Sequence, residues 1–185
     1  MKNIGKLLLL GAVAFAFNLP AVAKDKSEAE YMADLASPKE SLVIAALQGL
    51  EKNYPTDPAA VAKVKSMLTD PRPRVHEKAA RVLGAIHADV SGSELATITA
   101  MLNSPDKNEV GEALKALRGL KAEGTVPKIV PLLKHADANV KRDACRTLAV
   151  LGTKSNVSDI QPLLSDPDKA VVKDANDAIY TLNNK

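Results

Sequence analysis

Apolar residues in this chain follow a helical spacing that is itself repeated every 31 to 34 residues. Each unit is marked by a proline, or once by an alanine, at Pro38, Pro71, Pro105, Ala136 and Pro167. Eight residues after each marker stands an alanine, at Ala46, Ala79, Ala113, Ala144 and Ala175. A period in the thirties predicts a helical-repeat solenoid, because one such unit buries its apolar face only against its neighbours.

The residues after each marker predict the second helix of the unit. Four residues after the marker stand Leu42, Val75, Glu109, Val140 and Val171. Twelve residues after it stand Leu50, Leu83, Leu117, Leu148 and Ile179. These positions share one face of a helix with the alanines. Asp70, Ser104 and Asp166 precede three of the prolines, so we expect them to cap these helices.

A second apolar stretch before each marker predicts the first helix of the unit, over 61–68, 95–102, 126–133 and 157–164. In the first unit we expect this helix over 27–36, where Ser27 and Glu30 have capping-box spacing. Asp57 and Ser93 are expected starts for two others, and the internal Pro131 and Pro162 should bend theirs. The sequence therefore predicts an all-α solenoid of about five stacked helix pairs.

The composition of the 185-residue chain agrees with packed helices, since 46% of residues are hydrophobic, only 3% are aromatic and there is no tryptophan. The core must therefore be aliphatic. Cys145 is the only cysteine, so no intramolecular disulfide can form, and we expect a small, partly buried helix residue there.

The first 23 residues have a different pattern. Lys2 and Lys6 precede an apolar run over 7–17, and the small-residue triplet 21–23 follows. We predict a signal peptide over 1–23, cleaved after Ala23, and a mature repeat domain over 24–185. The apolar run is shorter than the roughly 20 residues that span a bilayer, so no stable membrane insertion is expected after cleavage. The predicted location is periplasmic or secreted.

Loss of Lys2 and Lys6 would lower the formal charge from +3 to +1. A nearly neutral domain gives no global electrostatic reason to expect nucleic-acid binding, which depends on clustered phosphate contacts. We therefore expect another protein as the partner.

Two segments carry a family resemblance: Met67 to Pro71 with Val75, Ala79 and Leu83, and Leu163 to Pro167 with Val171 and Ala175. They resemble HEAT repeats, and the short period resembles the HEAT-like repeats named after phycobilisome lyases. The resemblance covers about residues 27 to 183 and implies a right-handed stack whose second helices line a concave, protein-binding face. Tetratricopeptide repeats share a period of 34 but lack this order of residues. The arginine that HEAT repeats carry after the valine is replaced here by His76, Val110, Lys141 and Val172.

Side chains opposite the apolar face of the second helices are candidate partner contacts. They include a predicted basic stripe of Arg81, Lys115, Arg118, Arg142 and Arg146. Arginine binds carboxylates with two hydrogen bonds, so the stripe suits an acidic segment, although a solvated helix face is the plainer interpretation. Tyr180 is an additional candidate as an exposed aromatic residue.

Catalytic motifs are absent from the sequence, and the histidines His76, His87 and His135 occupy different positions in their repeats. His76-Glu77 resembles the pairs that HEAT-like iron hydroxylases repeat in several units, but one pair cannot build that di-iron site. We therefore expect no enzyme activity, no catalytic residue, no metal and no cofactor.

Together these patterns predict an exported scaffold or adaptor that holds an envelope or periplasmic protein on its second helices. The alternative is an accessory or chaperone-like subunit of a cofactor-dependent enzyme, which the lyase-type repeats suggest. Nucleic-acid binding ranks last.

Overall fold

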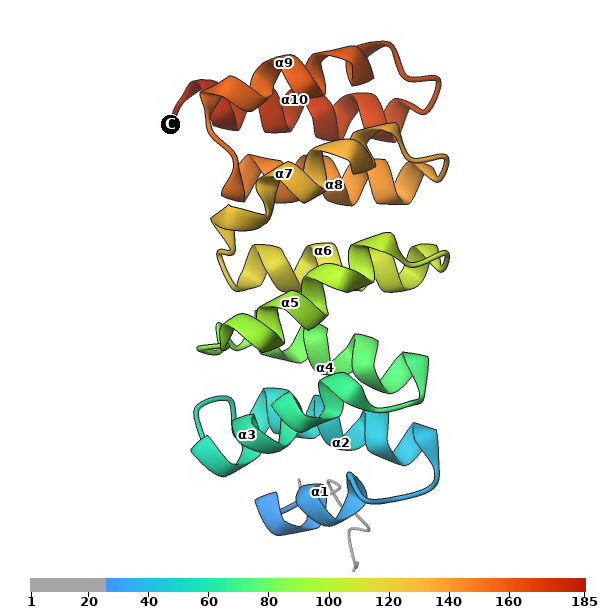
Figure 1. Ribbon diagram of the computed structural model, residues 1–185, viewed down its shortest axis with the longest axis vertical. Coiled ribbons are helices and arrows are strands. Elements are labelled where there is room, and N and C mark those ends of the chain that lie inside the picture. The colour runs from blue at the N-terminus through green and yellow to red at the C-terminus, as the bar shows by residue number, and fades with distance from the viewer. Residues whose placement is uncertain (1–25) are drawn as a thin grey trace, which may run out of the picture.

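In the computed structural model, which describes residues 26–185, five helical hairpins stack along one axis (Figure 1). The first helices of the hairpins are α1 (Glu28–Asp34), α3 (Pro58–Ser66), α5 (Gly92–Ala100), α7 (Val126–Ile129) and α9 (Val157–Ile160). The second helices are α2 (Glu40–Asn53), α4 (Pro73–Ala85), α6 (Lys107–Gly119), α8 (Ala138–Leu151) and α10 (Lys169–Asn183). The prediction of an all-α solenoid of five pairs is confirmed. The predicted signal peptide lies outside the described residues.

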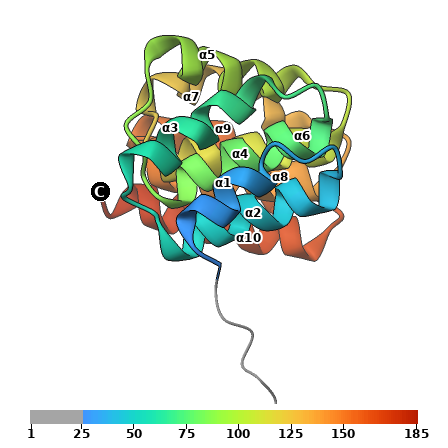
Figure 2. The same cartoon turned by 90° about the horizontal axis from the view of Figure 1, so that it is seen from below.

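The hairpins form two layers, with the first helices on one side and the second helices on the other (Figure 2). The closest packing runs between successive second helices, above all between α4 and α6 and between α8 and α10. Each second helix is therefore held mainly by its equivalents in the neighbouring repeats. Among residues 26–185, none of the helices combines the length and the apolar composition needed to cross a membrane.

Four of the first helices change to a tighter 3-10 helix at their ends. The 3-10 segments that follow α3, α5, α7 and α9 are η1 (Met67–Thr69), η2 (Met101–Asn103), η4 (Val130–Lys134) and η6 (Gln161–Ser165). In α7 and α9 the change coincides with Pro131 and Pro162, which lack the N–H that an α-helix would need there. Since α3 and α5 change without a proline, proline accompanies this feature but is not required for it. Two further 3-10 turns, η3 (Glu123–Thr125) and η5 (Lys154–Asn156), lead into α7 and α9.

The predicted alanine position is the most uniformly buried feature of the core. All five alanines are exposed by 1% or less. The predicted apolar position four residues before the alanine is less regular. In α2 and α6 the residues that point inward are Val43 and Val110, not the predicted Leu42 and Glu109. Val110 lies three residues before Ala113 and so shares its helix face. The side chain of Glu109, one residue earlier, therefore lies outside the core-facing side of α6.

The helix starts differ from the prediction by two residues. Asp70, Ser104 and Asp166 do not cap the second helices; each side chain accepts the backbone N–H two residues later, at 3.0, 3.1 and 2.9 Å. They close a turn that contains the proline, and the helix begins after that turn. The capping carboxylates come afterwards, at Asp106, Asp137 and Asp168.

Among the first helices, the capping box of Ser27 and Glu30 is confirmed, as is the cap at Asp57. The predicted start at Ser93 is wrong, because the capping box there is formed by Ser91 and Glu94. Cys145 is fully buried, and burial raises the pKa of its thiol to about 12, which makes it an inert core residue.

Helices α4 and α6 touch backbone to backbone near their C-terminal ends. A Cβ atom added to Gly84 would lie 2.6 Å from the Cα atom of Ala116, and one added to Gly119 would lie 2.2 Å from the carbonyl oxygen of Gly84. Real Cβ atoms do not approach backbone so closely. Glycine is therefore required at both positions by the spacing of the two helices.

We expect the substitution Gly84→Ala to lower the free energy of unfolding by about 1–3 kcal/mol, because the added methyl group must push α4 and α6 apart. Urea unfolding followed by circular dichroism measures this change. Gly92→Ala is the matched control, since nothing lies within 4 Å of that Cβ position in α5. Equal stability of Gly84→Ala and the wild-type protein would contradict the close contact.

Candidate partner-binding surface

The predicted basic residues lie on the second helices, and most of them are paired with carboxylates from the adjacent repeat. Glu51 of α2 accepts hydrogen bonds from Lys78 and Arg81 of α4, at 3.2 and 3.5 Å. The Nε atom of Arg81 also lies 3.7 Å from Glu112 of α6. Arg81 therefore links three successive second helices.

The same arrangement continues toward the C-terminus. The Nζ atom of Lys115 lies 2.9 Å from Glu112 in its own helix and 4.0 Å from Asp143 of α8. Arg146 of α8 lies 3.6 Å from Asp143. Positive and negative side chains thus alternate from one repeat to the next.

The C-terminal end of this series of charged side chains is Asp174 of α10, which is almost fully buried. Arg142 donates to Asp174 at 2.8 Å, and Arg146 donates to it at 3.2 Å. The carboxylate is thereby held between two arginines of α8, which compensates the cost of burying its charge.

We call this row the charge ladder; it contains five cations and four carboxylates: Lys78, Arg81, Lys115, Arg142 and Arg146 with Glu51, Glu112, Asp143 and Asp174. Four cations of the predicted basic stripe therefore stand in a row in which positive and negative side chains alternate. Sequence reasoning missed Glu51 and Asp174, which lie about one repeat away from the cations they bind. A search for opposite charges at a spacing of one repeat would have found them.

A second row of polar pairs runs along the N-terminal ends of the second helices. His76 lies 3.1 Å from Glu109, Lys107 donates to Asp137 at 2.8 Å, and Lys141 pairs with Asp166. His76 and Lys141 occupy the position of the HEAT arginine. Contacts between repeats therefore persist there in spite of the replaced side chain.

The charge ladder borders a cavity of about 420 Å³ at the C-terminal ends of α4 and α6. Its wall is made by Arg81, Gly84, Ala85, His87, Lys115, Arg118, Gly119, Lys121 and Val150. Gly84 and Gly119 belong to this wall at the place where the backbones of α4 and α6 meet. The structure thus brings together three of the predicted contact residues and places them around one hollow, which we call the basic pocket.

The basic pocket carries unneutralised positive charge. Arg118 and Lys121 have no ion-pair partner among residues 26–185, whereas Arg81 and Lys115 share Glu112. The ring of His87 faces the Gly119 carbonyl oxygen, with 2.7 Å between that oxygen and Nδ1. Two cations are therefore free to bind an anion that enters the pocket.

An apolar side chain stands beside these cations. Val150 near the end of α8 is 47% exposed and forms part of the pocket wall. The pocket therefore offers both charge and apolar contact to a bound segment.

The other predicted contact residues lie elsewhere. Arg142 and Arg146 belong to the Asp174 end of the charge ladder. Tyr180 of α10 is 73% exposed and is not part of the pocket wall. Partner binding by these three side chains stays a prediction.

Sequence reasoning missed His87 and Lys121 because both follow a helix end in a left-handed conformation, with φ of 52°. That position usually belongs to glycine, so neither residue carried a signal. The turns themselves are regular, since the N–H of the next residue bonds back to the carbonyl groups of Leu83 and Leu117, respectively.

Comparison with known proteins agrees with this architecture. Residues 95–180 match the family of HEAT repeats. No curated protein sequence matches the chain.

Among solved structures, the complex of CpcE and CpcF of phycocyanin lyase from Nostoc sp. PCC7120 is similar, with a TM-score of 0.74, 22% identity, and coverage of 91% of this chain and 70% of that one. A designed armadillo repeat protein in complex with the peptide (KR)4 has a TM-score of 0.64 at 16% identity, covering 83% of this chain and 80% of that one. An engineered protein has a TM-score of 0.64 at 24% identity, covering 83% and 78%. These likenesses establish the fold, an α-solenoid of stacked helix pairs, and residues 95–180 of this solenoid match the HEAT-repeat family.

Proposed function

We propose that this protein is an exported scaffold or adaptor that binds an acidic segment of an envelope or periplasmic protein on its second-helix face. Binding is centred on the basic pocket and extends along the charge ladder. The protein acts by holding its partner and not by catalysis.

The observation that carries this proposal is the pair of unneutralised cations, Arg118 and Lys121, on a face where the other cations of the predicted stripe have carboxylate partners. Solubility alone does not require that two unpaired cations both lie at the wall of one cavity. Carboxylates of a partner would bind both side chains there, while Val150 supplies an apolar contact.

The peptide complex of the designed armadillo protein gives a model for the binding mode. That protein, of similar fold, is complexed with a basic peptide. The basic pocket has the opposite charge, so an acidic segment is the complementary ligand for this chain.

The proposal predicts that a labelled peptide of alternating glutamate and leucine binds the protein more tightly than the peptide (KR)4, and that salt weakens the complex. Fluorescence anisotropy measures both affinities. We expect the double variant Arg118→Gln, Lys121→Gln to weaken binding about tenfold, which corresponds to about 1.4 kcal/mol.

The matched control is Lys128→Gln, Lys134→Gln, which removes the same charge from exposed residues of the first-helix layer. It should bind the acidic peptide like the wild-type protein. Equal loss in both double variants would mean that only net charge matters, and no preference for the acidic peptide would refute the proposed partner chemistry.

Export is the second part of the proposal and rests on the pattern of residues 1–23. Expression of the full chain in a Gram-negative host should yield a periplasmic protein whose first residue is Lys24, as determined by intact mass. Ala23→Arg should block this processing, because cleavage requires a small residue at that place. An intact, cytoplasmic wild-type chain would contradict export.

An accessory or chaperone-like subunit of a cofactor-dependent enzyme is the second candidate function. The observation that favours it is the similarity of fold to CpcE and CpcF of phycocyanin lyase over 91% of this chain. The two functions differ in one observable. An accessory subunit should be purified from its native source with a bound chromophore or enzyme, detected by visible absorption or mass spectrometry, whereas the adaptor should carry neither.

A further inference from the structure

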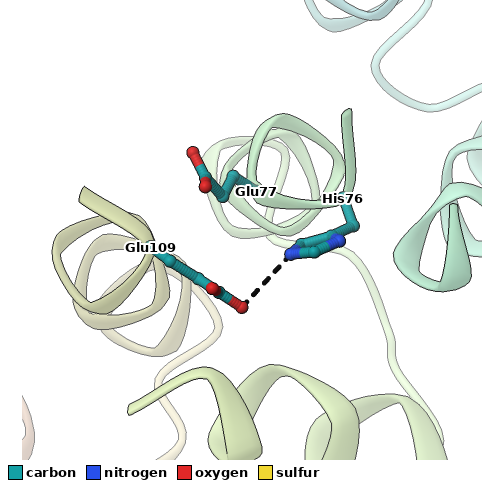
Figure 3. A group of neighbouring side chains, drawn as sticks. All are labelled: His76, Glu77 and Glu109. Atoms are coloured by element: carbon teal, nitrogen blue, oxygen red, sulfur yellow. Dashed lines mark hydrogen bonds and ion pairs between the residues drawn. The ribbon is translucent and has the colours of Figure 1, made fainter. Parts of the chain in front are cut away.

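Three side chains that can bind a metal ion lie near one another where α4 and α6 begin. In Figure 3, His76 and Glu109 point toward each other, and the carboxylate of Glu77 points away from the gap between them. His76 and Glu77 are neighbours in α4, and Glu109 comes from the first turn of α6. One possible ligand atom from each residue lies within 4.8 Å of those of the other two. The cluster is on the N-terminal side of the same helix pair whose C-terminal ends form the basic pocket.

The ring of His76 has a fixed orientation. Its Nδ1 atom lies 3.2 Å from the backbone carbonyl oxygen of Asp70, which can only accept a hydrogen bond, so Nδ1 carries the proton. In the neutral ring the lone pair of Nε2 then points at the Glu109 carboxylate, 3.1 Å away. Two acceptors face each other unless a proton or a cation lies between them. Metal-binding histidines typically donate the other ring nitrogen in this way.

The carboxylate of Glu109 is held from its other side. Its Oε2 atom accepts a hydrogen bond from Ser104 at 2.6 Å, which leaves Oε1 directed toward His76. A serine or backbone donor behind a carboxylate is also a typical outer contact of a metal ligand.

Glu77 is a largely buried acid without a partner among the side chains around it. It is only 8% exposed, and its carboxylate has no hydrogen-bond or ion-pair partner among residues 26–185. Burial, followed by the charges of Asp106 and Glu109, raises the pKa of Glu77. Neither oxygen of Glu77 is both fully buried and unpartnered, so the carboxylate keeps contact with solvent and a cation can reach it.

We propose that His76 Nε2, Glu109 and Glu77 bind one divalent first-row transition-metal ion, with Zn²⁺ as the reference. One imidazole nitrogen and two carboxylate oxygens are ligands that such ions accept. Two ligands at about 2.1 Å from a tetrahedral ion are about 3.4 Å apart, close to the observed separation of His76 and Glu109. Rotation of the Glu77 side chain completes the set.

The site would retain an open coordination position. His76 and Glu109 form part of the wall of a cavity of about 340 Å³, together with Leu68, Thr97, Ala100, Met101, Asn103 and Ser104. His76 and Glu109 border this hollow, and Glu77 borders another one. The fourth position is therefore left to water or a small ligand, as in metal sites that exchange ligands and unlike closed structural sites. This inference does not depend on the adaptor function.

Isothermal titration of the untagged, EDTA-treated protein with Zn²⁺ tests the site. We expect one ion per chain, and at least tenfold weaker binding in each of His76→Gln, Glu77→Gln and Glu109→Gln. Asp89→Asn and Glu123→Gln are matched controls, because both residues are exposed and outside the cluster, and they should bind like the wild-type protein. Zn²⁺ should raise the Tm of the wild-type protein and the controls only.

Wild-type protein gives a second test that does not require folded variants. Long-range ¹H–¹⁵N spectra should show the Nε2 resonance of His76 shifting on addition of Zn²⁺ while Nδ1 stays protonated. A His76 ring that titrates as an imidazolium and ignores Zn²⁺ would show a simple ion pair with Glu109 and overturn the proposal. Binding that survives both Glu77→Gln and Glu109→Gln would overturn it equally.

Discussion

The structure depends on how closely each second helix packs against the next. An alanine that is exposed by 1% or less lies at this contact in every repeat. A small residue there lets the helix axes approach, and the leucines around it fill the space between repeats. Between α4 and α6 the approach goes further, to backbone contact at Gly84 and Gly119. A chain with 3% aromatic residues has few bulky side chains with which to fill a wider gap.

This close stacking explains why the side-chain contacts between repeats connect residues about one repeat apart. Side chains at the same level of adjacent helices meet across the interface, so the Arg142–Asp174 and His76–Glu109 pairs are separated by 32 and 33 residues. The charge ladder stabilises the stack modestly where it is exposed and more where it is buried, as at Asp174. The ladder also neutralises most of the charge on the second-helix face. The two unpaired cations of the basic pocket are therefore a local concentration of positive charge.

The two proposed sites use opposite ends of one helix pair. At the C-terminal ends of α4 and α6, cations surround a hollow beside the contact of the two glycines. At the N-terminal ends, the turn that Asp70 and Ser104 close also places His76 and Glu109 face to face. The short distance between α4 and α6 determines both, so a change in their packing would alter the pocket and the cluster together.

The sequence by itself determined the repeat, the five helix pairs, the alanine contact and the burial of Cys145, because these follow from the spacing of apolar residues along a helix. It located helix starts correctly where the cap is local, as at Ser27 and Asp57. It failed at Asp70, because aspartate can either close a turn or cap a helix, and here it closes the turn. It failed also at Val110, because a shift of one residue decides which side chain points inward. Only the tertiary structure decided the charge pairing, the basic pocket and the approach of Glu109 to His76. These depend on the offset between helices of different repeats, and that offset is set by packing and not by any local pattern.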